Sequence, residues 1–519
     1  MRYLVTGKQA AEIDRHTIQD IGVPQLVLME RAALAVAEET TKLLKDDRKD
    51  WILVVVESGN NGGDGVAAAR ILHQRGYRVE VHPLNGISRQ SEAYQKQVEL
   101  AEKAGVPFTD RLQPEDYRVI VDAIFGVGLT REVKGVQKEA VEKINEVRAM
   151  SPEMKVIAVD IPTGISSETG EVLGEALRAD LTVTFGFEKV GMRFAKAYCG
   201  TVSVHEIGFF LPEKDGSADG FTDGSTNGSE FITYEKQDIR GLLPKRFMDG
   251  NKGSFGRVLV IAGSKEIGGA ACLAAEAAYR TGSGLVMVLT HEQNREVLQQ
   301  LLPEALLRTY TERPEEFLPD ILHWASVIIL GPGIGQSEVA SRLTEIVLRD
   351  ALCPVILDAD GINLAAEHTE WLLETAGKRP LILTPHMLEM LRLTEKTLHP
   401  ERTAMERLKQ NRADRVKETA ELYKATVVLK DACTMVTEGK DIFLNSSGND
   451  AMAKGGSGDV LTGIIAALIA QGLSSEKAAR LGVYIHGLAG DLARRELGQY
   501  SVMAKDLIRY VAEVLKLTD

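Results

Sequence analysis

Residues 449–463 of this 519-residue chain, NDAMAKGGSGDVLTG, constrain its fold more than any other segment. Three glycines (Gly455, Gly456 and Gly458) directly precede Asp459, and the apolar residues that follow repeat with the period of a helix. The pattern predicts a glycine loop at a helix N-terminus, where unpaired amides and the helix dipole favour an anion. A carboxylate beside that anion can take the proton from a hydroxyl group that is about to be phosphorylated. The pattern also fits a plain glycine turn with Asp459 as the helix N-cap.

Length and composition narrow the class of protein. A chain of 519 residues is too long for one core, so two or more domains are expected. The net charge of -13 argues against nucleic acid or an anionic membrane as a partner. Four scattered cysteines without a CxxC pair indicate a reducing compartment. The longest apolar stretch, residues 464–470, is too short to cross a bilayer and the N-terminus lacks the apolar run of a signal peptide, so we predict a cytoplasmic protein.

The first half alternates helical patterns with apolar runs typical of buried parallel strands. Helical periodicity covers residues 9–44 with a break at 22–24, and strands are predicted at 51–56, 78–82, 119–122 and 156–160. The first strand leads into a glycine-rich loop at 57–65 and then a helix at 66–75. Strand, glycine loop and helix can cradle a phosphate, although neither GxGxxG nor a Walker lysine is present.

Polar residues gather where these predicted strands end. Ligands of open α/β sheets bind beyond the carboxyl ends of the strands, so we expect four side chains to converge on one crevice: Asn61, Asp122, Asp160 and Thr163. In the loop at 57–65, the amide oxygens of Asn60 and Asn61 and the carboxylate of Asp64 suggest a bound cation as well as a nucleotide. Taken singly, each residue also fits a tight turn or a helix cap.

Five segments of the first half together resemble the NAD(P)H-hydrate epimerase domain, over most of residues 1–212: AEIDRHTI (11–18), LMERA (28–32), GNNGGDG (59–65), DAIFG (122–126) and VDIPTG (159–164). The resemblance implies a Rossmann-like domain that binds hydrated NADH or NADPH through Asn60, Asn61, Gly62, Gly63, Asp64, Gly126, Val127, Gly128, Leu129, Thr130, Arg131, Glu132 and Asp160. It also implies a potassium ion held by Asn61, Asp122 and a hydroxyl residue, here Thr163. Asp160, beside the bound ring, is our candidate for proton transfer.

Residues 213–230 are rich in Gly, Ser, Asp and Thr and predict a flexible linker, which places a second domain at residues 231–519. There, strands are predicted at 257–261, 285–289, 327–330, 355–358, 381–384 and 426–430, with a helix at 268–280 and a hairpin at 434–445. Strands that alternate with helices predict a second three-layer α/β/α domain. Taken alone, His386 fits a satisfied turn histidine and Lys430 a surface cation.

The second half resembles the ribokinase-like superfamily and, more closely, the ADP/ATP-dependent NAD(P)H-hydrate dehydratases, over most of residues 240–519. The resemblance rests on Lys252-Gly, GPGIG (331–335), DADGIN (358–363), TPH (384–386), NSSGN (445–449), residues 455–463 and His486-Gly. It implies hydrate contacts from Ala270, Gly333, His386 and Asp459, and nucleotide contacts from Lys430, Asp431, Ala432, Cys433, Thr434 and Gly458. Two departures from the family are Met387-Leu388 in place of Pro-Gly and Asp431 in place of Gly. Asp431 places a carboxylate near the expected phosphates, which it would repel.

The predicted function is repair of damaged nicotinamide cofactors. The first domain would interconvert the R and S hydrates of NADH and NADPH, and the second would dehydrate the S form with ADP, or ATP, and Mg²⁺, giving AMP and phosphate from ADP. A homo-oligomer is expected. Two alternatives stay open: a ribokinase-like kinase of a vitamin precursor, and a first domain that only binds a ligand or serves as a scaffold.

Overall fold

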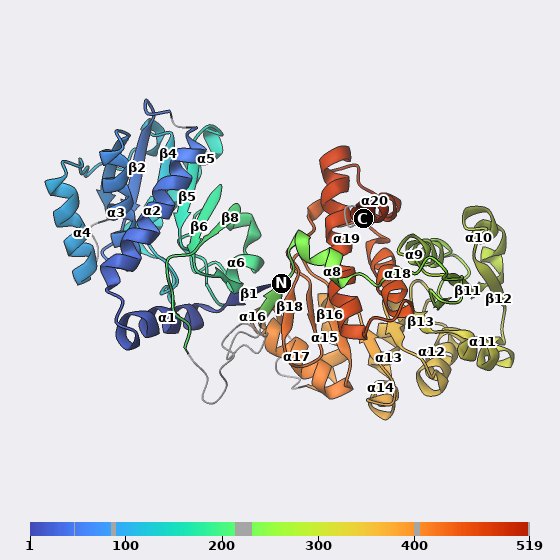
Figure 1. Cartoon of the computed structure of the whole chain (residues 1–519). Helices are drawn as coiled ribbons and strands as arrows, with labels where there is room; N and C mark the ends of the chain where they lie inside the picture. Colours follow the sequence, from blue (N-terminus) through green and yellow to red (C-terminus); the bar gives the residue numbers. More distant parts are fainter. Residues whose placement is uncertain (46, 85–89, 213–230, 399–404, 517–519) are drawn as a thin grey trace. The chain divides into compact units, whose positions relative to one another are not determined.

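The computed structural model describes residues 1–45, 47–84, 90–212, 231–398 and 405–516. The chain divides into two compact units, residues 3–229 and residues 230–519, and Met1 and Arg2 group with the second (Figure 1). The predicted linker at residues 213–230 lies outside the described residues. In the described ranges, no helix combines the length and the apolar character needed to cross a membrane.

The first unit is built on a parallel sheet whose strands are all paired in the same direction. The strand order is β3 (Arg78–Pro83), β2 (Trp51–Val56), β4 (Val119–Ala123), β5 (Lys155–Val159), β6 (Leu181–Phe185) and β8 (Thr201–His205). Outside this sheet, β1 (Arg2–Val5) pairs in parallel with β7 (Glu188–Lys189). The four predicted strands are confirmed, and β6 and β8 extend the sheet.

Helices cover both faces of this sheet, as the alternation of buried side chains requires. Ile52, Val54 and Val56 belong to one core with α2 (Gln25–Leu43), α3 (Asn60–Gln74) and α4 (Glu92–Lys103). Leu53 and Val55 belong to another core with α5 (Gly135–Met150). Three shorter helices are α1 (Gly7–Arg15), which continues as a π-helix at His16–Asp20, α6 (Val190–Phe194) and α7 (Lys196–Cys199). The first unit is therefore a three-layer α/β/α domain.

Helix α3 begins at Asn60, six residues before the helix predicted at residue 66. The glycines that predicted a loop lie inside its first turns, where they allow close packing. A Cβ atom on Gly62 would lie 1.6 Å from the carbonyl oxygen of Glu57, and one on Gly65 would lie 2.4 Å from the Cβ of Ala123. Close approach of the helix to the sheet, rather than loop flexibility, explains these two glycines.

The second unit contains a longer, mixed sheet. The strand order is β12 (Leu306–Tyr310), β11 (Leu285–His291), β10 (Arg257–Ile261), β13 (Val327–Leu330), β14 (Val355–Leu357), β15 (Leu381–Leu383), β16 (Thr426–Leu429), β17 (Met435–Thr437), β18 (Ile442–Leu444) and β9 (Phe231–Thr233). In this order, the strands from β12 through β11 and β10 to β16 are parallel to one another. Strands β17 and β18 form the predicted antiparallel hairpin, and β9 pairs in parallel with β18.

The helices of the second unit form two groups, one on each side of the strands (Figure 1). One group consists of α9 (Gly269–Arg280), α18 (Ser457–Ala470), α19 (Ser475–Leu497) and α20 (Ala504–Lys516), which pack on one another. The other includes α12 (Glu338–Asp350), α13 (Asp360–Glu367), α14 (Thr369–Thr375), α15 (Met387–Glu395) and α17 (Arg412–Tyr423). The remaining described α-helices are short: α8 (Ile239–Leu242), α10 (Arg295–Leu301), α11 (Leu318–Trp324) and α16 (Met405–Gln410). The predicted fold class, two three-layer α/β/α domains, is confirmed.

Candidate active sites

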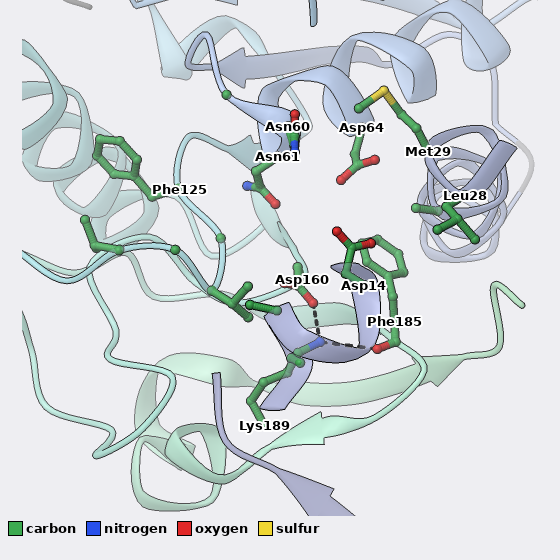
Figure 2. A pocket seen from close by; sticks show the side chains of 18 of the residues that line it. Asp14, Leu28, Met29, Asn60, Asn61, Asp64, Phe125, Asp160, Phe185 and Lys189 are labelled. Carbon is green, nitrogen blue, oxygen red and sulfur yellow. Dashed lines mark hydrogen bonds and ion pairs between the residues drawn. The ribbon is translucent and has the colours of Figure 1, made fainter. Parts of the chain in front are cut away.

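A cavity of about 740 Å³ opens in the first unit beyond the carboxyl ends of β2, β4, β5 and β6 (Figure 2). It lies at the point where the strand order reverses, between β2 and β4, which is where open α/β sheets bind ligands. Most of the predicted substrate residues line it: Asn60, Asn61, Asp64, Gly126, Val127, Gly128, Leu129, Thr130, Arg131 and Asp160. The other three predicted substrate residues, Gly62, Gly63 and Glu132, do not line the cavity. The two glycines are buried within α3, and Glu132 forms an ion pair with Lys134 at 3.0 Å.

Asp160 directly follows β5 and is held in a left-handed backbone conformation, with φ of 67°. Its Oδ1 atom accepts hydrogen bonds from Lys189 Nζ at 2.5 Å and from Thr184 Oγ1 at 3.1 Å. Lys189 is 3% exposed, and it also donates to Thr184 Oγ1 at 2.8 Å and to the carbonyl oxygen of Phe185 at 3.3 Å. The strained backbone and the buried ion pair fix this carboxylate at the cavity wall. Lys189 was not among the residues predicted from the sequence. Its position shortly after an apolar run is the one local feature that could have indicated it.

Two further carboxyl groups face the same cavity, and Asp14 was not singled out in the sequence. Asp14 comes from α1 and Asp64 from α3, and Figure 2 shows their carboxyl groups turned toward each other. Burial, followed by the nearby negative charge of Asp160, raises the pKa of Asp14 and raises that of Asp64 well above its usual range. The cavity therefore contains carboxyl groups in two different electrostatic environments.

The predicted cation ligands lie together around the end of β4. Asp122 is fully buried and accepts hydrogen bonds from Thr163 Oγ1 at 2.7 Å, from the Thr163 amide at 2.8 Å and from the Ile124 amide at 3.2 Å. It has no ion-pair partner among the described residues, and burial raises the pKa of Asp122 to about 6. The side-chain nitrogen of Asn61 is buried without a hydrogen-bond partner. A buried carboxylate without a counter-charge fits a ligand of a monovalent cation, and Asn61 can add its side-chain oxygen, which adjoins Gly126.

In the second unit, the predicted residues follow four strands that are neighbours in the sheet. Gly331 follows β13, Asp358 follows β14, Thr384 follows β15 and Lys430 follows β16. Asp358 is 1% exposed, and its Oδ1 accepts from Lys430 Nζ at 2.6 Å and from Thr384 Oγ1 at 2.7 Å. Lys430 is therefore no surface cation: it is part of a polar cluster at the carboxyl edge of the sheet.

The glycine loop brings Asp459 to this cluster. Helix α18 begins at Ser457 and its N-cap is Gly456, with φ of 93°, so the alternative in which Asp459 is the N-cap is wrong. A Cβ on Gly458 would lie 3.4 Å from Lys430 Nζ and 3.8 Å from Asp358 Oδ2, which places the first turn of α18 against the cluster. Burial, and then the charge of Asp358, raise the pKa of Asp459 to about 7, while Lys430 opposes the rise. A carboxyl group with this pKa is suited to general-base catalysis near neutral pH.

The other residues predicted to contact the hydrate, His386, Gly333 and Ala270, lie in two places near the carboxyl edge of the sheet. His386 is the N-cap of α15: its Nδ1 accepts from the amides of Leu388 and Glu389, and its Nε2 lies 3.3 Å from Glu389 Oε1. Its backbone bridges to Lys430, so it borders the cluster. Gly333 and Ala270 adjoin each other, because a Cβ on Gly333 would lie 3.2 Å from that of Ala270. The segment Met387-Leu388 forms the first turn of α15, and Glu389 closes a capping box with His386.

The residues predicted to hold the nucleotide surround the end of β16. Asp431 lies 3.5 Å from Arg412 Nη1, so a cation accompanies the carboxylate that replaces the glycine of the family. The Cys433 side chain is buried, with its Sγ donating to the carbonyl oxygen of Asn445 at 3.6 Å, and Thr434 Oγ1 donates to the carbonyl oxygen of Asp431 at 3.2 Å. Ala432 is exposed. Arg412 could not be found from the sequence, because α17 and β16 come together only in the fold.

Known proteins match both units. A family model described as NAD(P)H-hydrate dehydratase matches residues 258–513, and one described as YjeF-related protein N-terminus matches residues 25–191. A ribokinase-like superfamily protein from Enterococcus faecalis is 28% identical and covers 56% of this chain and 96% of its own, with a TM-score of 0.50. An ADP/ATP-dependent NAD(P)H-hydrate dehydratase from Bacillus subtilis, co-crystallized with ATP and Mg²⁺, is 30% identical and covers 55% of this chain and 98% of its own, with a TM-score of 0.47.

A similarity of nearly full length comes from a bifunctional NAD(P)H-hydrate repair enzyme of Thermofilum pendens. The two chains are 34% identical over 524 residues, which cover 97% of this chain and 94% of the relative. Because one relative accounts for both halves, a kinase with an unrelated first domain is not favoured. The chain belongs to the family of bifunctional NAD(P)H-hydrate repair enzymes.

Proposed function

We propose that the cavity of the first unit epimerises hydrated NADH and NADPH, with Asp160 as a proton-transfer residue. The observation that supports this role is the fixed carboxylate of Asp160 in a cavity large enough for a nicotinamide ring and ribose. The first turn of α3 includes the lining residues Asn60 and Asn61, and its amides have no side-chain cap. Free amides at a helix N-terminus suit the negatively charged phosphates of the substrate.

A potassium ion fits the residues around Asp122. Asn61, Asp122 and Thr163 would hold it, and its charge would compensate the buried carboxylate and fix the loop that carries Phe125 and Gly126. Thr163 also accepts a hydrogen bond from the amide of Phe125 at 3.0 Å, which links the ligand set to the cavity lining.

The second unit is proposed to dehydrate the S hydrate in an ADP-dependent reaction. Asp459 takes the proton of the ring hydroxyl, and the first-turn amides of α18 stabilise the phosphoryl group that is transferred to the hydroxyl oxygen. Phosphate then leaves with the electron pair of the C–O bond while the lone pair of the ring nitrogen forms a C=N bond, and loss of the proton on the adjacent ring carbon to solvent gives the dihydronicotinamide ring. Lys430 lies beside this turn and suits the nucleotide phosphates, whose bound Mg²⁺ would reduce their negative charge.

One experiment tests both activities. The purified protein is incubated with a mixture of hydrated NADH epimers and either ADP or ATP, and recovery of NADH is followed by its near-UV absorbance. Complete recovery with ADP preferred is the expected result. Recovery that stops at the S fraction would refute epimerisation and favour a scaffold role for the first unit, and no recovery with either nucleotide would refute the dehydratase proposal.

Two properties of the whole protein complete the proposal. A cytoplasmic location is consistent with four free cysteines in the described residues, three of them buried. A homo-oligomer is also proposed, and size-exclusion chromatography with light scattering tests it: a single monomeric species at all concentrations would refute it.

A further inference from the structure

Of the four carboxyl groups that line the cavity of the first unit, Asp14, Asp64 and Asp160 come from three different segments, and among the described residues only Asp160 has a cation as partner. Asp160 is paired with Lys189, whereas Asp14 and Asp64 make no hydrogen bond or ion pair with any residue that the structure describes. Their oxygens are directed into the space that the substrate would occupy (Figure 2). The other charged residues of the lining are Glu57, which accepts a hydrogen bond from Gln137 at 2.7 Å, and the exposed Arg131.

The charges around the cavity cannot all be present in the ligand-free protein. Much of the wall beside Asp14 and Asp64 is apolar, formed by Leu28, Met29 and Phe185. Two neighbouring carboxylates without a counter-ion in such surroundings repel each other and lose hydration, so one proton is retained between them. Burial first, and then the charge of Asp160, raises the pKa of both groups; the charge of Asp14 adds to the rise for Asp64, and Lys189 opposes the rise for Asp14. Asp160, in contrast, forms an ion pair with the buried Lys189 at 2.5 Å.

We propose that Asp14 and Asp64 share one proton and that Asp64 donates it to the substrate, as the acid partner of the base Asp160. The proposal rests on the epimerase function proposed above. Asp64 is the donor because it lies one helical turn from Asn60 and Asn61, in the part of α3 that faces the expected substrate. Asp14 is a positioning residue that keeps the proton on the pair.

The resulting reaction is balanced in atoms and charge. Asp64 protonates the hydroxyl oxygen of the hydrate, the C–O bond breaks, and water leaves while the lone pair of the ring nitrogen forms a C=N bond. The negative charges of the cavity stabilise this cationic intermediate. Water then adds to the opposite face of the same carbon, and Asp160 takes the proton that this water loses. Transfer of that proton back to the Asp14–Asp64 pair through solvent restores the starting state, with no net consumption of water.

Alternative uses of these acids fit the geometry less well. In the described ranges, no group of three or more His, Cys, Asp or Glu side chains is arranged to hold a metal ion. A purely structural role would require partners that hold the carboxyl groups in place, and neither Asp14 nor Asp64 has one in this part of the chain. The open position of both groups at the cavity wall therefore favours proton transfer.

The test uses the full chain and the variants Asp64→Asn, Asp14→Asn and Asp110→Asn, the last being an exposed carboxyl of the same unit that serves as the matched control. The pure R hydrate is supplied with ADP, so that the second unit converts each S molecule formed to NADH, and the spontaneous rate without enzyme is subtracted. Dehydration of the pure S hydrate is measured in parallel for every variant. This design separates epimerisation from the dehydratase step.

Asp64→Asn is expected to lower epimerisation about 100-fold, the usual contribution of a general acid, with dehydration of the S hydrate unchanged and partial recovery in Asp64→Glu. Asp14→Asn removes a charge that raises the pKa of Asp64, so the alkaline limb of the rate profile is expected to move to lower pH. Asp110→Asn should match the wild type. Wild-type epimerisation in Asp64→Asn, or an unchanged pH profile in Asp14→Asn, would overturn the proposal. Failure of the wild type itself to convert the R hydrate would instead refute the epimerase function.

Discussion

The role of Asp459 can be tested quantitatively from the acid limb of the pH–rate profile, the range in which the dehydration rate rises with pH. Burial and the charge of Asp358 raise the pKa of Asp459 to about 7, and the residue must be ionised to act as a base. A group with this pKa is about 10% ionised at pH 6 and about 90% ionised at pH 8, so the rate should rise roughly tenfold over this range. Replacement by Asn, which cannot accept the proton, should lower the rate by about 10²-fold or more and leave epimerisation intact.

The substitution Asp358→Asn should shift the acid limb of this pH–rate profile toward lower pH. The substitution removes a negative charge that raises the pKa of Asp459, and it leaves Lys430, now 2.6 Å from a neutral group, with Glu389 and Asp459 as the carboxyl groups that it faces. Both changes favour the ionised carboxylate, so the midpoint should move about one unit toward lower pH. The Asn oxygen can still accept from Thr384 Oγ1, which limits structural damage.

The assay is the initial rate of NADH formation from the pure S hydrate at saturating nucleotide, measured across the pH range for wild type, Asp358→Asn and the exposed surface control Asp320→Asn. Titration of the nucleotide phosphates affects all three proteins equally and cancels in the comparison. An acid limb that keeps its midpoint in Asp358→Asn, in an enzyme that still turns over, would refute the electrostatic argument. Wild-type dehydration by Asp459→Asn would refute the assignment of the base.

Three further predictions concern the first unit. Lys189→Met should destabilise this unit by about 3–5 kcal/mol in urea unfolding and abolish epimerisation, because it leaves the charge of Asp160 without its buried partner; a stable, active variant would contradict this. Because burial raises the pKa of Asp122 to about 6, above its unfolded value, the free energy of unfolding without potassium should fall as pH rises from about 4 to about 6. Potassium chloride, compared with sodium chloride in thermal unfolding, should restore this loss above pH 6 in the wild type but not in Asp122→Ala; equal effects of the two salts would argue against the site. Gly62→Ala should destabilise the unit by about 1–3 kcal/mol or prevent its folding, since the added Cβ would lie 1.6 Å from the Glu57 carbonyl oxygen, and a wild-type unfolding temperature would refute the packing argument.

Local patterns in the sequence predicted much of the architecture. Apolar runs such as Trp51–Val56 and Val327–Leu330 mark strands buried on both faces, because such strands need apolar side chains at every position. Carboxylates at strand ends, such as Asp122 and Asp160, could be placed near one another because parallel strands end at the same edge. The start of α3 was predicted too late, since glycines in a packed first turn have the same local signature as glycines in a loop.

The sequence alone predicts most of the central strands, the two α/β/α domains and the residues at the ends of parallel strands, because these follow from periodicity and from the direction of the chain. Which charged side chains meet depends on the tertiary fold. Lys189 reaches Asp160, Arg412 reaches Asp431, and Asp14 faces Asp64 because distant segments converge. The protonation state of a carboxyl group depends on its burial and on charges within a few ångströms. Those distances are set by packing between elements, and no local pattern in the sequence records them.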